Sequence, residues 1–346
     1  MIALPDMKHP RISIALGLVT AGIALTAAAG GYHVTGKFAV GGEGGWDYLT
    51  ADSAARRLYV SHAGQVEVLD LDSGEVVGKI SDTPGVHGIA IATESGRGFV
   101  SCGRSANVKI FDLKTLKPVG EAATGKNPDA IIYDPASRRV FAFNGGSASA
   151  TAIDAADGKV AGTIELGGRP EFATADGAGH VFVNVEDKSE VVRVDSKNLT
   201  AGSHWPLAPC EEPSGMAIDV RQHRLFIGCS NKMMAVMDSE NGHVVTTLPI
   251  GDGVDANGFD PGTGLAFSSN GDGTLTVVHE DSPDKFSVLE NAKTVRGART
   301  MALDTKTHHV LLSTAEYGPA PAPTADRPRP RPPVLPGSFA ILVMGQ

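Results

Sequence analysis

The chain has 346 residues, with 42 glycines and 21 prolines, 5% aromatic residues and a formal net charge of −9. This length suits one large domain or two ordinary ones, and the many turn-forming residues favour a fold made of many short strands. The acidic balance excludes a broad surface for nucleic acid or anionic membranes, so no nucleic-acid partner is expected.

The first 29 residues differ in character from the rest. Lys8 and Arg11 precede an apolar run from Ile12 to Ala29, which ends in small residues of the kind that signal peptidase recognises. The pattern predicts a signal peptide over 1–29 and a periplasmic or secreted protein over 30–346, with no further membrane segment. The run is long enough that an uncleaved membrane anchor is the alternative.

After this segment the chain repeats one pattern six times: an apolar strand, a polar residue at its end, a turn, and another apolar strand. The strand-ending residues recur every 41–43 residues and are Asp70, Asp112, Asp154, Asp195, Asp238 and His279. Apolar residues alternate within these segments, as they do in half-buried β-strands. Self-similarity at this period is typical of β-propellers, in which each repeat is one four-stranded sheet.

Each repeat is opened by a further strand that follows a turn, and seven such openings occur. They begin near Gly44, Pro84, Asn127, Arg169, Glu212, Gly253 and Gly297. We therefore expect an all-β, seven-bladed propeller of four-stranded antiparallel sheets. The last blade lacks a fourth strand, while a strand at about 32–40 is left over at the start. Pairing of that strand with one at about 338–344 would close the ring without a free edge.

The three cysteines suggest one disulfide. Cys210 precedes the opening strand of the fifth blade and Cys229 follows its second strand, so both lie on the same face of a propeller. We expect these two to pair in an oxidising compartment. Cys102 is then unpaired and is expected to fill a buried position.

Residues 315–337 interrupt the repeat between the second and third strands of the last blade. This loop is rich in proline and carries Arg327, Arg329 and Arg331, a composition that favours an extended polyproline conformation. It is expected to project from the face that carries the channel mouth. It either covers that mouth or docks on a partner, or else it is a solvated insertion.

The repeats resemble those of the YncE-like group of bacterial secreted propellers, which are built from YVTN-type repeats. The matching segments are LYVSH from Leu58, DPASRRVFAFN from Asp134, DPGTGLAFSSN from Asp260 and the strands that end in the repeated Asp. The resemblance covers the chain after residue 29 and implies the same fold. It leaves the function open, because related propellers include binding proteins, lactonases, lyases and subunits of redox enzymes.

Alignment of the seven openings places one residue of each blade at the mouth of the central channel. These rim residues are Asp47, His87, Asp129, Glu171, Ser214, Asp255 and Arg299. Strand packing would accept small or apolar side chains there, so this set indicates a site for a cation or a small polar ligand. Clustered carboxylates repel one another unless a proton, a cation or an arginine compensates. The alternative is that these side chains cap neighbouring strands around a channel filled with water.

Other candidates follow the second strands or stand beside the rim. They are Trp46, His62, Asn144, Glu186 and Asn270. Trp46 either stacks on a ligand or is wedged between blades, and the two asparagines either face a ligand or form turns with left-handed backbone.

A divalent metal such as Ca²⁺, Mn²⁺, Fe²⁺ or Zn²⁺ would suit oxygen ligands with imidazole. We expect its ligands among His62, His87, Asp47, Asp129 and Glu171.

Two functions are compatible with these residues. The first is a secreted binding or interaction module, expected to be a monomer, that presents the channel mouth to a cation, a small polar ligand or a protein. The second is a metal-dependent hydrolase or lyase, similar to a lactonase, with a rim carboxylate or His87 as base and Arg299 holding an anionic group. No nucleophile-elbow, zinc-protease or haem-attachment motif occurs in the sequence. Whether the protein is an enzyme therefore stays open.

Overall fold

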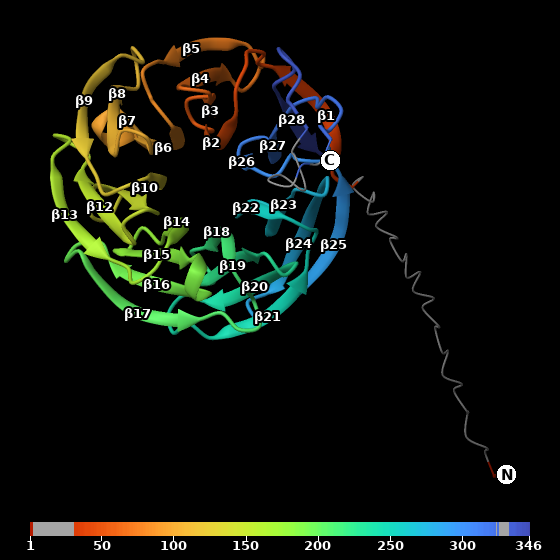
Figure 1. Ribbon diagram of the computed structural model, residues 1–346. Coiled ribbons are helices and arrows are strands. Elements are labelled where there is room, and N and C mark those ends of the chain that lie inside the picture. The colour runs from red at the N-terminus through yellow and green to blue at the C-terminus, as the bar shows by residue number, and fades with distance from the viewer. Residues whose placement is uncertain (3–30, 323, 325–331) are drawn as a thin grey trace. The chain divides into compact units, whose positions relative to one another are not determined.

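The computed structural model describes residues 1–2, 31–322, 324 and 332–346. Gly31–Gln346 make up one compact unit, in which seven four-stranded antiparallel sheets are arranged in a ring (Figure 1). The predicted seven-bladed propeller is therefore confirmed. The proposed signal peptide lies almost wholly outside the described residues. Within the described part of the chain, no helix is long and apolar enough to cross a membrane.

The four strands of each blade run in order from the channel to the outside. The innermost strands are β2 (Trp46–Asp52), β6 (Val86–Ala92), β10 (Pro128–Asp134), β14 (Pro170–Ala175), β18 (Pro213–Asp219), β22 (Val254–Asp260) and β26 (Met301–Asp304). The second strands are β3 (Arg57–His62), β7 (Arg97–Cys102), β11 (Arg139–Asn144), β15 (His180–Val185), β19 (Arg224–Cys229), β23 (Leu265–Asn270) and β27 (His309–Thr314). The third strands are β4 (Gln65–Asp70), β8 (Asn107–Asp112), β12 (Ser149–Asp154), β16 (Glu190–Asp195), β20 (Met233–Asp238), β24 (Thr274–Ser282) and β28 (Ala340–Gly345). The outermost strands are β5 (Val76–Ile80), β9 (Pro118–Ala123), β13 (Val160–Glu165), β17 (Thr200–Pro206), β21 (Val244–Pro249), β25 (Lys285–Lys293) and β1 (His33–Ala39).

Helical structure in the described chain is limited to two single 3₁₀ turns, η1 (Thr93–Ser95) and η2 (Glu186–Lys188).

The repeated aspartate ends the third strand because its side chain holds the turn that follows. Asp70 Oδ1 accepts hydrogen bonds from the backbone N–H groups of Asp72 at 3.0 Å and Ser73 at 2.8 Å. Asp154 and Asp238 bind the N–H groups two and three residues further on in the same way. Such bonds from a short carboxylate to its own backbone stabilise tight turns. The repeated residue in the sequence therefore marks, in each of these blades, the turn that joins the third strand to the fourth.

The two ends of the propeller unit close the ring. Strand β1 pairs antiparallel with β28, with His33 opposite Gly345 and Ala39 opposite Ala340. The last sheet thus takes its outermost strand from the start of the unit and its other three from the end. This pairing confirms the predicted closure, and it leaves no unpaired edge on β28.

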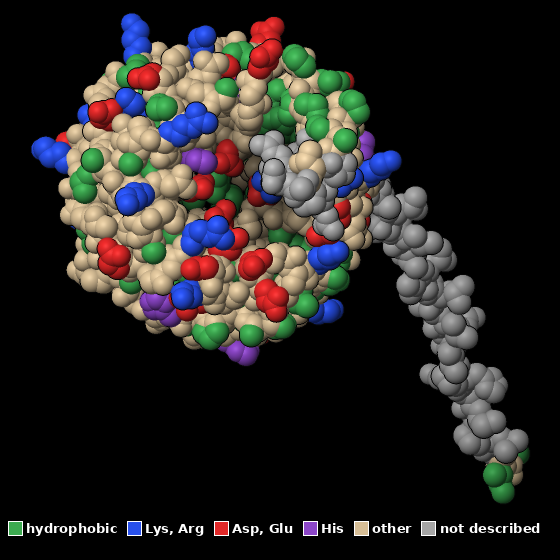
Figure 2. Space-filling model, in the orientation of Figure 1, with side chains coloured by type: hydrophobic (Ala, Val, Ile, Leu, Met, Phe, Trp, Pro, Cys, Tyr) green, Lys and Arg blue, Asp and Glu red, His purple; other side chains and the backbone are tan. Residues whose placement is uncertain are grey.

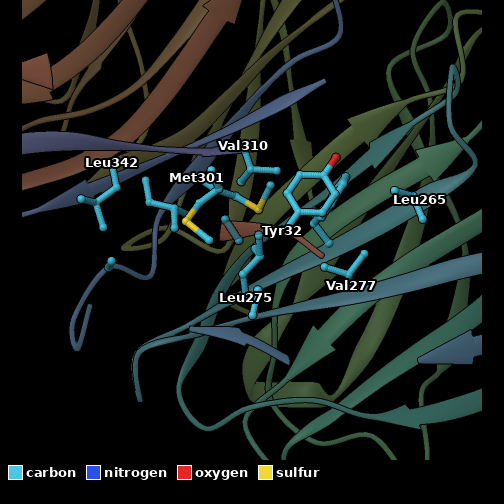
Figure 3. Packing of buried hydrophobic residues seen from close by; sticks show 13 residues of the cluster. Tyr32, Leu265, Leu275, Val277, Met301, Val310 and Leu342 are labelled. Atoms are coloured by element: carbon cyan, nitrogen blue, oxygen red, sulfur yellow. The ribbon is translucent and has the colours of Figure 1, made fainter. Parts of the chain in front are cut away.

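The hydrophobic core lies between neighbouring blades. The cluster between the last two blades combines Leu275 and Val277 of β24 with Met301 of β26 and Val310 of β27 (Figure 3). Tyr32, directly before β1, completes this cluster. Its ring lies edge-on to Phe267 with 5.1 Å between the ring centroids, and its hydroxyl donates to the backbone of blade seven. The start of the unit is thereby anchored by packing as well as by strand pairing.

The innermost strands are irregular near their starts. In blade one the pairing of β2 with β3 shifts between Trp46 and Leu49, and blades two to six have the same kind of shift. Such bulges re-aim the side chains of the residues that they contain. The second residue of each innermost strand lies within this shift in blades one to six, and that position is the predicted rim position.

Two further predictions concern the loops on the rim face. Cys210 and Cys229 form a disulfide with Cα atoms 5.7 Å apart. The proline-rich segment connects β27 to β28, and at its base Tyr317 pairs with Val334 in an isolated bridge. Its three arginines lie outside the described residues.

Candidate functional site

The rim residues line one mouth of the channel. Figure 2 shows this face, with acidic side chains and a histidine gathered around a central hollow. Six of the residues occupy the second position of an innermost strand, and Arg299 lies two residues before β26. Seven residues separated by about forty positions each are brought together because every blade contributes the same strand position.

Asp47, His87 and Asp129, from three consecutive blades, form the tightest group. His87 Nδ1 lies 2.6 Å from Asp47 Oδ2 and 3.6 Å from Asp129 Oδ1. One potential ligand atom from each residue lies within 4.8 Å of the other two. The three side chains are between 23% and 32% exposed, so they are open to the channel but partly withdrawn from bulk water. We call these three residues the rim triad.

Electrostatics within the rim favour protons or a cation. Burial raises the pKa of Asp129 to about 6, with Asp47 adding to the shift and His87 opposing it. Burial tends to lower the pKa of His87, but the hydrogen bond that the imidazole donates to Asp47 and the nearby carboxylates outweigh it and raise the pKa. Positive charge is therefore stabilised between this imidazole and the two carboxylates.

Glu171 carries the most perturbed carboxyl group of the rim. Burial, followed by the charges of Asp129, Glu186, Asp255 and Asp47, raises the pKa of Glu171 to about 8. Glu171 is therefore mostly protonated at neutral pH. It belongs to the rim but not to the rim triad.

The other side of the rim is balanced by arginines. Arg299 Nη1 lies 3.6 Å from Asp255 Oδ1. Burial raises the pKa of Asp255 to about 6, and Arg299 offsets part of this shift. Arg169 Nη2 lies 2.6 Å from Glu186 Oε2, which places Glu186 beside the rim in an ion pair. The rim therefore has a carboxylate–imidazole side and a carboxylate–guanidinium side.

Hydrogen bonds between blades hold the rim backbone in place. Ser101 Oγ, at the penultimate position of β7, donates to the backbone carbonyl of Asp129 in the next blade at 2.5 Å. Asn184 Nδ2 donates to the carbonyl of Ser214 at 2.7 Å from the same position of β15, and Ser269 of β23 donates to the carbonyl of Arg299. The rim residues are thus positioned by the second strand of the preceding blade.

Two aromatic rings meet across the channel just below the rim. Tyr48 and Phe172 are the residues that follow Asp47 and Glu171, and their ring centroids are 5.0 Å apart although they come from blades one and four. The corresponding residues of the other blades are Gly88, Ala130, Gly215, Ala256 and Thr300. These small residues leave room for two rings to meet across the channel. Tyr48 and Phe172 form what we call the aromatic plug.

The structure places several predicted residues away from the rim triad. His62 is buried, with its ring centroid 4.4 Å from that of Phe339, so it packs between blades one and seven rather than beside His87. Trp46 stacks on the same Phe339 at 4.9 Å and is wedged between blades. The expectation that His62 shares a metal with His87 is therefore wrong, because packing against the end of the chain turns it inward.

The two predicted asparagines are buried inside their blades. Asn144 Nδ2 donates to Thr151 Oγ1 at 3.0 Å, and Asn270 Nδ2 donates to Thr276 Oγ1 at 3.0 Å. Both link the second strand to the third, and neither has left-handed backbone. Their roles as ligand contacts and as left-handed turn formers are both wrong. Cys102 is a free, buried thiol, as expected.

The prediction from sequence missed Ser101, Arg169 and the aromatic plug. The alignment that gave the rim also contained the signal for the plug, because the position after the rim is small in five blades and aromatic in two. Ser101 gave no such signal, since its partner is a backbone carbonyl of another blade.

The rim triad has a geometry that fits a divalent cation. Ligand atoms about 2.1 Å from one ion lie roughly 3.0–3.5 Å apart, and the two N···O distances of the triad, 2.6 and 3.6 Å, bracket this range. Two carboxylates and one imidazole form a donor set suited to Mn²⁺, Fe²⁺ or Zn²⁺, and with further oxygen ligands to Ca²⁺. The residues present therefore fit a metal, whose positive charge would offset that of the two carboxylates.

Comparison with known proteins identifies the fold. No protein-family model and no curated protein matches the sequence. A structure of U3-55K is similar, with a TM-score of 0.73 and 9% identity over 90% of this chain and 98% of that chain. A crystal structure of the RRP9 WD40 repeats has a TM-score of 0.74 and 9% identity over 91% of this chain and 97% of that chain. At this identity the likeness concerns the fold alone. The chain is a seven-bladed β-propeller with WD40-repeat structures among its neighbours.

Proposed function

We propose that this protein is a secreted or periplasmic binding module of the YncE-like, YVTN-repeat kind, whose channel mouth holds a divalent cation. The observation that carries the proposal is the convergence of Asp47, His87 and Asp129, whose ligand atoms lie within 4.8 Å of one another. Glu171 and Arg299 stand on the same rim and would contact a small polar ligand or a partner group bound over the cation. The ion would supply the positive charge that the clustered carboxylates lack.

Location outside the cytoplasm is part of the proposal. It is supported by the charged and then apolar character of residues 1–29 and by the disulfide between Cys210 and Cys229, which suits an oxidising compartment. Expression of the full chain in a bacterium, followed by fractionation and N-terminal sequencing, tests it. A mature chain that starts near residue 30 is expected, and an intact chain in the cytoplasm would contradict the location.

The cation site is tested by elemental analysis of protein purified without chelator or affinity-tag metal, and by calorimetric titration with Mn²⁺, Zn²⁺ and Ca²⁺. We expect one equivalent of cation, lost in His87→Ala and Asp129→Asn. His204→Ala is the matched control, because His204 also pairs with a carboxylate, at 2.7 Å, but on the outer strand β17. Stoichiometric binding that survives both rim substitutions would contradict the site.

A metal-dependent hydrolase or lyase is the second candidate, and Glu171 favours it. Burial raises the pKa of Glu171 to about 8, and a cation on the rim triad would lower it toward neutrality, so this group could give up or take a proton during a reaction. Arg299 would then hold an anionic group of the substrate. Turnover of a lactone panel that disappears in Glu171→Gln while cation binding persists would support this reading. Cation binding without turnover of any lactone would favour the binding module over the enzyme.

A further inference from the structure

The channel contains a second compartment below the aromatic plug. A cavity of about 390 Å³ is lined by residues that follow the rim positions along β2, β6, β10 and β14, together with Met301 of β26. Its volume falls within the range of sites for small organic ligands. Because its lining starts at Tyr48 and Phe172 and continues toward the opposite face, it is separate from the proposed cation site.

Much of the cavity wall is main chain. The lining consists largely of consecutive residues, 48–51, 88–91 and 130–133. These stretches belong to innermost strands, which are the edges of their sheets. An edge strand leaves alternate N–H and C=O groups without a partner in the sheet. The cavity therefore presents hydrogen-bond donors and acceptors between its side chains.

The side chains of the lining carry no charge. They are aliphatic or aromatic, apart from glycine and Thr50, and the Thr50 hydroxyl already donates to the carbonyl of Ile89 at 2.7 Å. Tyr133, toward the end of β10, donates its hydroxyl to Glu94. Carboxylates thus stand beyond both ends of the cavity, at the rim and at Glu94. This arrangement disfavours an anionic ligand, because no cation in the lining would compensate its charge.

We propose that this cavity binds a small uncharged molecule that has an aromatic or alicyclic ring and one or two hydrogen-bonding groups. The ring of the ligand packs against Tyr48 and Phe172, which form the end wall of the cavity. Its polar groups bind the free peptide edges of the innermost strands. The cavity lies toward blades one to four, where Gly88 and Ala130 provide the space.

Methyl NMR of methionine-labelled protein tests the proposal directly, with 2-naphthol as the probe. Met301 lines the cavity, whereas Met344 is buried in β28 and does not. We expect a saturable shift of the Met301 methyl signal with no shift of Met344. We also expect 2-naphthoate, an anion of similar size, to bind at least about tenfold more weakly, a difference of about 1.4 kcal/mol. Absence of the Met301 shift up to the solubility of 2-naphthol, or equal binding of the anion, would overturn the proposal.

A pair of substitutions locates the site. Ile132→Trp fills the cavity and is expected to weaken 2-naphthol binding by at least about tenfold. Leu289→Trp is the matched control, because Leu289 is 55% exposed on the outer strand β25, and it should leave binding unchanged. Equal binding by the two folded variants would overturn the site. If Ile132→Trp does not fold, the Met301 shift and the naphthoate comparison decide the question on the unmodified protein.

Discussion

The position of Glu171 on the propeller raises the pKa of its carboxyl group far above the ordinary value for glutamate. It comes from an innermost strand, and four other carboxyl groups act on it across the channel mouth. A propeller brings equivalent strand positions of all blades to one ring, so a like-charged set accumulates there without any local sequence motif. The cost of ionising Glu171 is therefore set first by its burial and then by carboxyl groups, three of which come from other blades.

The pH dependence of stability should reveal this cost. The pKa of Glu171 is raised by burial from 4.5 to about 8, so the folded chain holds this proton more tightly than the unfolded chain. The resulting stabilisation is complete below pH 4.5 and is lost as the pH rises through 8. We expect Glu171→Gln to remove this part of the pH dependence and to stabilise the protein above pH 8 by on the order of a few kcal/mol.

Urea unfolding at pH 5, 7 and 9 measures this effect. Glu75→Gln is the matched control, because Glu75 is an exposed residue in the turn before β5. Parallel stability curves for Glu171→Gln and the unmodified protein would show that Glu171 ionises normally.

The Cys102 thiol is expected not to react with alkylating reagents in the folded protein. Its thiol is completely buried, and burial raises its pKa to about 11. Because the thiolate is the reactive form, iodoacetamide at pH 8 should modify no cysteine in the folded protein and one in protein unfolded without reductant. Mass spectrometry counts the adducts. Rapid modification of the folded protein would contradict the burial.

At the scale of single elements, the position of a rim residue depends on the second strand of the preceding blade. Ser101 of β7 holds the Asp129 carbonyl, so it acts on the rim triad only as a positioning residue. We expect Ser101→Ala to cost about 1–2 kcal/mol of stability and to weaken cation binding about tenfold without changing its stoichiometry. Calorimetry and urea unfolding measure both effects.

The neighbouring Ser105 gives the control for this prediction. Its hydroxyl bonds to the Asn107 side chain at an exposed position, at 2.6 Å, so Ser105→Ala should change neither quantity. Unchanged affinity in Ser101→Ala at equal stability would show that the bond does not position Asp129.

The elements themselves were predictable because their causes are local. Alternating apolar residues and the turn held by Asp70 or Asp154 act within a few residues, so the repeat, the blade count and the rim positions could be read from the sequence. His62 could not be placed, because Phe339, which turns it inward, lies at the other end of the chain. Asn144 is a different case, because its partners Ser149 and Thr151 are only five and seven residues away, yet their spacing does not tell whether the amide points to them or to the channel. Local patterns thus predicted the framework and the rim, but contacts between strands, near in the sequence for Asn144 and far for His62, decided which side chains face the channel.

At the scale of the whole molecule, the last blade acts as a clasp. Its outermost strand, β1, is joined through residues 40–45 to the first blade, while β26 follows from the sixth. Blade seven is therefore connected by the chain to both of its neighbours, and no boundary between blades lacks a covalent connection. Opening the ring requires either a strand to leave blade seven or the face between two linked blades to separate.

A circular permutant that removes the clasp should fold but open more easily. Joining Gln346 to Gly31 through a short glycine linker is feasible, because His33 pairs with Gly345. Cutting between Gly42 and Glu43, both exposed, then makes every blade from consecutive strands and leaves blades one and seven without a chain connection. We expect all seven sheets to form, with a loss of unfolding free energy on the order of 2–5 kcal/mol from the lost closure of a long loop.

The matched control has the same linker but is cut in the turn between β8 and β9. Its first strand is then β9 and its last strand is β8, and these two pair within blade two. Blade two thus joins the two ends of this permutant, as blade seven does in the unmodified protein. It should keep nearly the stability of the unmodified protein, because every boundary between blades remains connected by the chain. Urea unfolding compares the three proteins, and hydrogen exchange should show faster opening of β2 and β26 only in the permutant cut between blades. If both permutants lose the same free energy, the closure contributes through strand pairing alone and the chain connection between blades one and seven is not what holds the ring shut.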